Sequence, residues 1–404
     1  MDGHLRVLAP ARKRREQEGG GESGKRWAAG HRAPHGYGDP LGMAALMYPR
    51  PGTPVNWPRR GVPASPESPM LPPCMAELPR LRLMVPPVDP GTESRRTPEP
   101  RRGPRTGRIV SVGGGKGGVG KSLVAASLGI DLARRGSRVV LVDCDLGGAN
   151  LHTSLGIGPP RRTLSEFVNH QVERIEDVVV PTGIPNLSLV SGALDGLDAA
   201  NPKHGQKMRF LRHLQSMDVD FAVLDLAAGT QKNTIDFFLL ADHKVLVLAP
   251  EPSSVENAHR FVKAAYWRRL RATCSIFGVA DLLDELLADG RYRAPSQVLD
   301  AIEEADAETG RQLREQTAAF RPGLVVNQVR TTADAELGPG IAAAWRRHFG
   351  IEADFLGAVE HDDEVWRAAR ERRPLLLARS PGRAARSLAR IAGRLRDTDR
   401  IART

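Results

Sequence analysis

The 404-residue sequence has little cysteine, few aromatic side chains and no long apolar run. Its three cysteines, Cys74, Cys144 and Cys274, are far apart and odd in number, so neither a disulfide framework nor a zinc knuckle is expected, and a reducing compartment fits. No apolar run reaches the roughly 18 residues that a membrane-spanning helix needs. The first part of the chain carries charge throughout and has no apolar core, so we expect no signal peptide.

Positive charge is abundant but unevenly distributed. The formal net charge is +11, to which residues 1–105 contribute +8 and residues 367–404 contribute +9. The part between them, 106–366, has a net charge of −6. The whole-chain charge therefore averages unlike segments, and a uniformly basic nucleic-acid-binding domain is not expected.

Proline marks the first boundary. Nineteen of the 31 prolines lie in residues 1–105, where periodic apolar segments are missing. This composition predicts a disordered Pro/Arg-rich leader with local polyproline character. Three interpretations stay open: a basic arm that tethers the protein to an anionic surface, an unstructured leader without a role, and a segment upstream of the true start codon.

After residue 106, short apolar runs alternate with segments of helical spacing. Strands are expected at 108–114, 137–143, 187–192, 221–226, 244–250, 324–329 and 355–359. Helices are expected at 122–136, 205–216, 232–241, 254–271 and 336–348. This alternation predicts an α/β fold with a mostly parallel sheet covered by helices on both faces. We expect one domain over 106–397, with a helical insertion or lid at 277–320 and a tail at 398–404.

The most informative stretch is GGGKGGVGKS, from Gly113 to Ser122, which fits the pattern G-x-x-x-x-G-K-[ST] between a predicted strand and a predicted helix. Glycines let successive backbone N–H groups turn toward one anion, and the helix N-terminus adds partial positive charge. Lys121 then reaches the β- and γ-phosphates, and the Ser122 hydroxyl ligates Mg²⁺. The stretch predicts a nucleotide phosphate site.

A second lysine, Lys116, opens the heptapeptide KGGVGKS, which resembles the deviant Walker A loop of the MinD/ParA class of ATPases. The resemblance covers about residues 107–396 and implies a three-layer P-loop NTPase fold, with ATP and Mg²⁺ bound. It implies that Lys116 reaches across an ATP-dependent homodimer to the partner's phosphates; the alternative is a solvated loop lysine. The nucleotide contacts implied in this loop are Gly115, Lys116, Gly117, Gly118, Val119, Gly120, Lys121 and Ser122.

The next strand ends in VDCDLGGANL, which resembles the first switch of that class. By this resemblance Asp145 orients the attacking water and is catalytic together with Lys116 and Lys121, while Asp143 supports the Mg²⁺ shell. Both carboxylates point to the same strand face because they are two residues apart. The alternative for the pair is solubility at a strand end.

The segment DFAVLDLAAGT is similar to the Walker B strand and second switch. Asp225 would join Ser122 and Asp143 around the metal, and the backbone N–H of Gly229 would follow the γ-phosphate. The dipeptide Leu226-Ala227 stands where MinD has Ser-Pro, and this form is closer to the FlhG branch, which regulates flagellar number and placement.

Two further segments resemble the same branch. LVVNQVR ends a predicted strand in Asn327, whose amide would read adenine; the alternative is that Asn327 caps a strand turn. LAPEPSSVENAHRFVKA resembles the strand–PEP–helix segment, in which Pro250 and Glu251 would flank the base.

The C-terminal stretch 380–397 has apolar residues at three- and four-residue steps and arginines mostly elsewhere. One interpretation is a basic amphipathic helix that lies on an anionic membrane. The other, which we favour, is the last helix of the domain, packed on the sheet with its arginines in solvent.

Together these features predict a cytoplasmic ATPase that acts as a slowly hydrolysing dimerisation switch and positions or regulates a cellular structure, peripheral on the inner face of the cell membrane if 380–397 binds lipid. Its protein activator or cargo is not identified by the sequence. One alternative is a regulator that uses ATP only for occupancy and sequesters a transcription factor or polar protein. Another is a ParA-like DNA partitioning ATPase that binds DNA through its arginine-rich ends, which the acidic body disfavours.

Overall fold

The described part of the chain begins one residue before the first predicted strand. The computed structural model describes residues 107–401, with gaps at 146–147, 193–203, 289 and 293. The predicted leader, 1–105, lies outside the described residues, so the interpretations given for it stay predictions.

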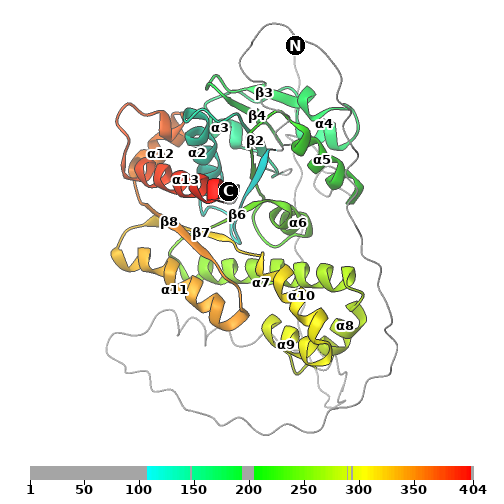
Figure 1. Cartoon of the computed structure of the whole chain (residues 1–404). Coiled ribbons are helices and arrows are strands. Elements are labelled where there is room, and N and C mark those ends of the chain that lie inside the picture. The colour runs from blue at the N-terminus through cyan, green and yellow to red at the C-terminus, as the bar shows by residue number, and fades with distance from the viewer. Residues whose placement is uncertain (1–106, 146–147, 193–203, 289, 293, 402–404) are drawn as a thin grey trace, which may run out of the picture. The chain divides into compact units, whose positions relative to one another are not determined.

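An eight-stranded sheet runs through the described residues in the order β3-β4-β2-β5-β1-β6-β7-β8 (Figure 1). Its strands are β1 (Arg108–Gly113), β2 (Val139–Asp143), β3 (Val179–Pro181), β4 (Leu187–Val190), β5 (Phe221–Asp225), β6 (His243–Leu248), β7 (Gly323–Val329) and β8 (Asp354–Glu360). All seven predicted strands are confirmed to within two residues at each end. The sequence did not indicate β3, a three-residue edge strand antiparallel to β4 that ends in a proline.

Helices cover both faces of this sheet, as predicted. The longer ones are α2 (Lys121–Arg134), α5 (His204–Ser216), α6 (Lys232–Leu240), α7 (Pro252–Ile276), α8 (Ala280–Ala288), α9 (Pro295–Ala305), α10 (Ala307–Ala318), α11 (Thr332–Phe349), α12 (Asp363–Arg370) and α13 (Arg383–Ile401). Short helices are α3 (Leu151–Ser154), α4 (Leu164–Val168), η1 (Ile175–Val178) and η3 (Leu375–Leu377).

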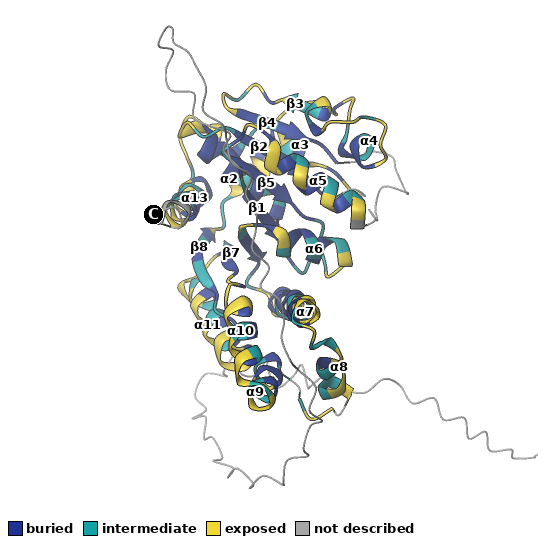
Figure 2. Ribbon diagram, turned by 45° about the vertical axis from the view of Figure 1, so that its right-hand side comes forward, coloured by how far each residue is buried: buried dark blue, intermediate teal, exposed yellow. Residues whose placement is uncertain are grey.

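Two apolar cores hold the layers together, one on each face of the sheet. On one face α5, α6, α7 and α11 bury large side chains such as Phe210, Phe238 and Trp345. On the other face α2 and α13 pack on the strands through smaller side chains such as Leu128 and Leu388. The strands between them are almost entirely buried (Figure 2), which explains why they read as continuous apolar runs in the sequence.

The segment predicted as helical material at 277–320 forms a third apolar cluster. There α8, α9 and α10 pack with the C-terminal half of α7 around Cys274, Leu283, Leu299, Ile302 and Leu313. We call these three helices together with that half of α7 the helical lobe. Three helices in this segment agree with its predicted helical character, while its status as an insertion stays a prediction.

The C-terminal helix α13 packs on the domain. Its apolar residues Ala384, Leu388, Ile391 and Leu395 are buried against α2 and β8, and the helix continues to Ile401, four residues past the predicted domain end. The favoured interpretation of 380–397 as a structural helix is therefore confirmed. A membrane-bound helix with this apolar face in lipid does not fit, because the face already contributes to the core. In the described part of the chain no helix is long and apolar enough to cross a membrane.

Candidate functional site

The predicted site residues gather where the C-terminal ends of the central strands meet. Asp143 on β2 is the register partner of Asp225 on β5, and β5 pairs in turn with β1, from which the glycine loop emerges. In parallel sheets this edge is where ligands bind. Asn327 reaches the same loop from β7, which is separated from β1 only by β6.

At two positions of the loop, close packing against other segments leaves no room for a side chain, quite apart from the binding of an anion. Gly120 has φ +95°, and a side chain there would overlap the amide nitrogen of Asn327. A side chain at Gly115 would overlap the backbone carbonyl of Asn257 on α7. The sequence pattern alone assigned these glycines to phosphate binding, whereas the structure shows that they also let β7 and α7 approach the loop.

Lys121 begins α2 and is only 9% exposed. Burial lowers the pKa of its ammonium group, and the carboxylates of Asp225 and Asp145 partly oppose this shift. Its Nζ makes one long hydrogen bond in the described structure, to the backbone carbonyl of Lys116 at 3.4 Å. A buried cation with a single weak partner is well placed to receive an anionic group.

The surroundings of Asp225 disfavour the ionised form of its carboxylate. Burial, followed by repulsion from Asp143, raises its pKa to about 7, while the hydroxyl of Ser122 donates a hydrogen bond to its carboxylate and Lys121 favours the ionised form. Its Oδ1 is buried and has no hydrogen-bond partner among the described residues. Because a divalent cation would satisfy that oxygen and offset the repulsion, Ser122 and Asp225 fit a Mg²⁺ ion.

Asp143 holds the main chain of the first switch. Its Oδ1 accepts the backbone N–H of Asp145 and its Oδ2 accepts that of Leu151, both at 3.0 Å. Burial raises its pKa to about 6, and these hydrogen bonds oppose the shift. The sequence pointed to a metal role that stays a prediction, and it missed this bracing role. Within the described ranges no group of three or more His, Cys, Asp or Glu side chains is arranged around a metal position.

Asp145 stands at the start of the switch turn. Its carboxylate is near enough to stabilise the charge of Lys121, and its backbone carbonyl accepts the N–H of Gly148 at 3.2 Å. The side-chain amide of Asn150 donates to the carbonyl of Gly148 at 2.8 Å and so helps to shape this turn. A carboxylate in this place can accept a hydrogen bond from a water molecule beside the phosphates.

Gly229 is close to the glycine loop but does not yet face a ligand. It has φ +89°, and its backbone N–H donates to the carbonyl of Gly114 at 3.1 Å. The predicted contact with a γ-phosphate therefore requires this hydrogen bond to open, so the loop must change conformation when the site fills.

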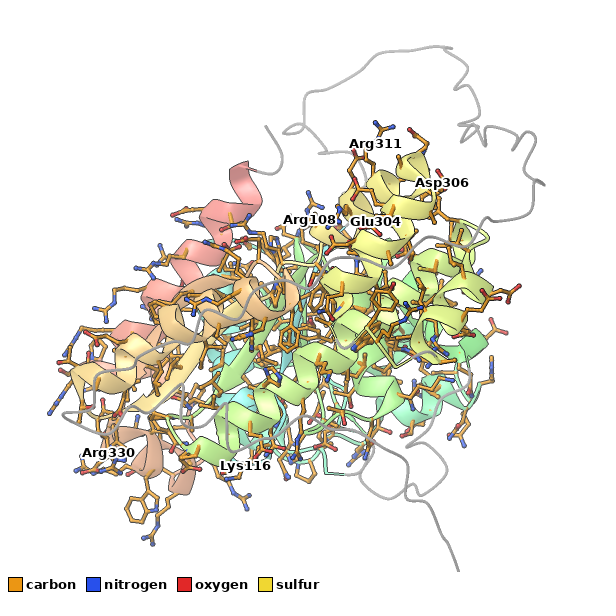
Figure 3. All side chains as sticks on the ribbon, turned by 90° about the horizontal axis from the view of Figure 1, so that it is seen from below. Arg108, Lys116, Glu304, Asp306, Arg311 and Arg330 are labelled. Carbon is orange, nitrogen blue, oxygen red and sulfur yellow. The ribbon has the colours of Figure 1, made fainter. Side chains whose placement is uncertain are left out.

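Lys116 is engaged within its own chain. Its side chain is labelled in Figure 3. The Nζ lies 3.1 Å from the Oε2 of Glu251 and 3.0 Å from the Oγ of Ser253, both at the start of α7. The lysine side chain is 41% exposed, so it is not buried in this arrangement. The ion pair between Glu251 and Lys116 was not foreseen from the sequence, and the place of Pro250 and Glu251 beside the base stays a prediction.

The end of β7 supports the glycine loop from the side. Asn327 is 4% exposed, and its Nδ2 donates to the carbonyl of Val119 at 2.8 Å. Gln328, which sequence reasoning missed, has φ +63° and donates from Nε2 to the carbonyl of Gly118 at 3.2 Å. The side-chain amide of Asn327 thus donates one hydrogen bond to the loop. Its contact with adenine stays a prediction. The only signal in the sequence was a polar pair interrupting an apolar strand.

Comparison with known proteins gives a consistent picture. A family model described as the CobQ/CobB/MinD/ParA nucleotide binding domain matches residues 110–375. The antiactivator FleN of Pseudomonas aeruginosa is 34% identical over 158 residues, which is 39% of this chain and 55% of that protein. The chain thus spans about half the length of the curated relatives it matches. The MinD/ParA class and the FlhG/FleN branch predicted from the sequence are both represented among the relatives.

Two solved structures share the fold. The cell division ATPase MinD of Pyrococcus furiosus aligns with a TM-score of 0.50 and 22% identity, covering 72% of this chain and 99% of that one. The septum site-determining protein MinD of Pyrococcus horikoshii, solved with Mg-ADP, aligns with a TM-score of 0.50 and 21% identity, covering 73% and 98%. The predicted three-layer α/β fold is confirmed by these likenesses.

Proposed function

Because the chain belongs to the CobQ/CobB/MinD/ParA nucleotide-binding domain family, we propose that it binds ATP with Mg²⁺, hydrolyses it slowly and switches between a monomer and a dimer. The observation that carries this proposal is the buried Asp225 carboxylate with one unpartnered oxygen, beside Ser122 and the poorly partnered Lys121. These groups are arranged for a metal-bound polyphosphate, and the likeness to a MinD solved with Mg-ADP supports the same cofactors.

Each residue has one task in the proposed reaction. Lys121 and the loop N–H groups hold the β- and γ-phosphates and offset the charge that develops on them. Ser122 and Asp225 hold Mg²⁺, which neutralises phosphate charge when it is bound. Asp145 orients the attacking water, and Asp143 keeps the Asp145 backbone in place through its hydrogen bond.

Two contacts explain why turnover by the monomer should be slow. Lys116 is held by Glu251 and Ser253 of its own chain, and the Gly229 N–H is held by Gly114. Neither group is free to stabilise the transition state in this arrangement. We propose that dimerisation with ATP transfers Lys116 to the partner's phosphates and thereby completes the site.

The test of hydrolysis is the ATPase rate of the wild type, Asp145→Ala and Asp218→Ala. Asp218 is an exposed carboxylate before β5, at the opposite end of the strands from the phosphate loop, so its variant controls for loss of negative charge. We expect Asp145→Ala to lose at least about 100-fold in rate while Asp218→Ala is unchanged. Equal rates for all three proteins would reject a hydrolytic switch.

The test of dimerisation is size-exclusion chromatography with Mg-ATP, with and without Lys116→Ala. We expect an ATP-dependent dimer for the wild type and a monomer for the variant. A wild type that stays monomeric at every nucleotide condition would remove the switch from the proposal, even if ATP were bound.

A second candidate is a regulator that needs ATP only for occupancy and sequesters a transcription factor or polar protein. The printed description of the relative FleN as an antiactivator favours it. In that case the Asp145→Ala variant would bind ATP and partner normally and would equal the wild type in activity. Intact Lys116 and Asp145 favour the hydrolytic switch over this candidate.

We infer a cytoplasmic location for either candidate. Within the described residues, a contact of α13 with an anionic membrane or with DNA phosphates would use its exposed arginines, such as Arg383 and Arg386, since the apolar face of that helix is buried. Sedimentation with anionic vesicles and a DNA mobility shift at moderate salt test these two surfaces separately. Spatial positioning of a cellular structure remains the role that best fits an ATP-dependent dimer switch.

A further inference from the structure

A groove of about 860 Å³ runs along the outer strand β8 and reaches Val329 and Arg330, which follow the two residues of β7 that support the phosphate loop. In the described structure β8 is the last strand of the sheet, with α13 on one side of it and α11 on the other, and Figures 1 and 2 agree on this arrangement. The floor of the groove is formed by Phe355, Leu356, Gly357 and Ala358 of β8. An outer strand carries backbone groups that a further strand can pair with.

The outer edge of β8 is partly blocked. The β7–β8 register shifts between Leu324 and Val325, so that Leu356 is an extra residue in β8, and Gly357 follows it with φ +149°. At this bulge the Nη1 of Arg394 donates to the backbone carbonyl of Leu356 at 2.8 Å. Bulges and inward-pointing charges are common means of keeping unrelated strands from pairing with an open edge.

The two walls of the groove differ in chemistry. The α13 wall presents Arg383, Arg390 and Arg394, which are seven and four residues apart and therefore lie on one side of the helix. The α11 wall presents Thr332 and Ala335, with Arg330 and Thr331 just before the helix, together with the half-buried Phe355 of β8. An occupant of this groove meets the three arginines of α13 on one side and a mixture of small, hydroxyl and apolar groups with one further arginine on the other.

Of the four acidic residues that line one end of the groove, Glu360, Asp362, Asp363 and Glu364, two already have close partners. Asp362 accepts the backbone N–H groups of Glu364 and Ala384, which caps α12 and fixes the start of α13. Glu364 pairs with Arg367 and Arg373. The arginine row along β8 is engaged more loosely, since the Arg390 guanidinium is 4.0 Å from Glu360.

We propose that this groove binds an extended acidic segment of a partner protein, which adds to the sheet as a strand beside β8. A carboxylate of the incoming strand takes over the guanidinium of Arg394, and a backbone N–H of that strand takes over the carbonyl of Leu356. The exchange gives both groups a new partner, whereas a neutral or basic strand would displace the exposed Arg394 from the carbonyl without offering it an ionic partner. Arg394, which blocks the edge of β8 in the free protein, would thus select an acidic strand.

The geometry also specifies the pattern of the segment. Successive side chains of a strand point to opposite faces, so carboxylates at every second position face α13 and apolar residues between them face α11. Residues 355–360 offer a strand of roughly 20 Å at about 3.3 Å per residue, which matches six to eight residues of partner. This binding needs no nucleotide, so it is separable from the proposed ATPase cycle.

The probe is a labelled octapeptide of alternating valine and glutamate, blocked at both ends and titrated with the full chain by fluorescence anisotropy. We expect saturable binding, and at least about tenfold weaker binding of the matching valine–glutamine and valine–lysine peptides. The valine–glutamate peptide with every backbone nitrogen methylated keeps its charge but cannot pair with β8, so we expect it not to bind. No saturable binding of the unmodified peptide, or equal binding of the methylated one, would overturn the proposal.

Two arginines of α13 provide a matched pair of variants. Arg390 and Arg386 are both exposed, but only Arg390 lines the groove. We expect Arg390→Glu to weaken binding of the acidic peptide at least about fivefold and Arg386→Glu to leave it within about twofold, with thermal melting confirming that both fold. Equal losses in the two variants would show a general charge effect and reject the groove.

Arg394→Ala tests the selective block directly. Removing the guanidinium opens the Leu356 carbonyl to any strand, so we expect the neutral valine–glutamine peptide to bind this variant about as tightly as the acidic one. If the wild-type preference for the acidic peptide persists in Arg394→Ala, Arg394 does not select the strand and that part of the proposal is wrong.

Discussion

The phosphate-loop edge of the sheet and the helical lobe differ in where their charged side chains lie, buried in the first and at the surface in the second. At the edge, Asp143, Asp225 and Lys121 are buried with shifted pKa values and few partners. In the lobe the interior is apolar and the charges lie at the surface, where several are paired, as Arg314 is with both Asp300 and Glu303. Buried charges left incompletely paired are unfavourable for folding, so they mark the part of the molecule that is built for a ligand.

The same comparison locates the negative charge of the body. Residues 277–320 hold ten acidic and four basic residues, a net charge of −6, which equals the net charge of the whole stretch 106–366. Glu304, Asp306 and Arg311 are on the lobe in Figure 3, at a distance from Lys116 in that view. The rest of the body is therefore balanced, and its chemistry depends on where individual charges are buried.

The largest expected effect belongs to the edge. Lys121→Ala removes the buried cation, and we expect ATP turnover to fall at least about 100-fold because the phosphates lose their main charge partner. The exposed Lys232→Ala serves as a control that should keep the wild-type rate. A Lys121→Ala protein with near-normal turnover would mean that the edge is not the catalytic part of the molecule.

The next effect belongs to the lobe and should be one of stability alone. Leu299→Ala removes a buried side chain from the lobe core, and we expect a loss of about 3 kcal/mol in the free energy of unfolding of the lobe. Urea denaturation followed by circular dichroism measures this. At a temperature where the variant stays folded we expect its ATP turnover to match the wild type. A parallel loss of turnover would show that the lobe contributes to the catalytic site, contrary to the difference drawn here between the two regions.

A third prediction concerns pH without Mg²⁺. The pKa of Asp225 is raised to about 7, above the ordinary aspartate value near 4 that it has when unfolded, so the folded state binds the proton more tightly. The stability from this proton is present below pH 4 and is lost as pH rises toward 7. We expect the melting temperature to fall by several degrees between pH 5 and about 8, and Asp225→Asn to flatten this slope. If the dependence of melting temperature on pH is the same in Asp225→Asn as in the wild type, another group titrates in this range.

The smallest effect tests the engaged Lys116. Glu251→Gln removes its ionic partner, and we expect the ATP concentration for half-maximal dimerisation to fall about two- to fivefold, as for other exposed ion pairs. Glu256→Gln, which breaks the ion pair with Arg260 on the same helix, is the matched control. Analytical ultracentrifugation across an ATP series gives both values. An unchanged midpoint for Glu251→Gln would show that this contact does not restrain the dimer.

Prediction from sequence succeeded where the pattern is local. The strands of the sheet were found because buried parallel strands are continuous apolar runs, and the phosphate loop because glycine spacing and a following lysine are a local requirement. It failed at β3, which at three residues is too short to form such a run and ends in a proline. It also missed the contact of Gln328 with the loop and the ion pair of Glu251 with Lys116, since both join residues more than 130 positions apart in the chain.

The sequence by itself determined the class of fold, the phosphate loop and the carboxylates that accompany it, because each depends on residues close together in the chain. Tertiary structure alone decided how these groups are used: Asp143 as a brace for the switch, Asn327 as a support for the loop and Lys116 as the partner of Glu251. It also decided that α13 lies against the sheet and that β8 has an open edge. Burial and pairing arise only when distant segments meet, so no local pattern can encode them.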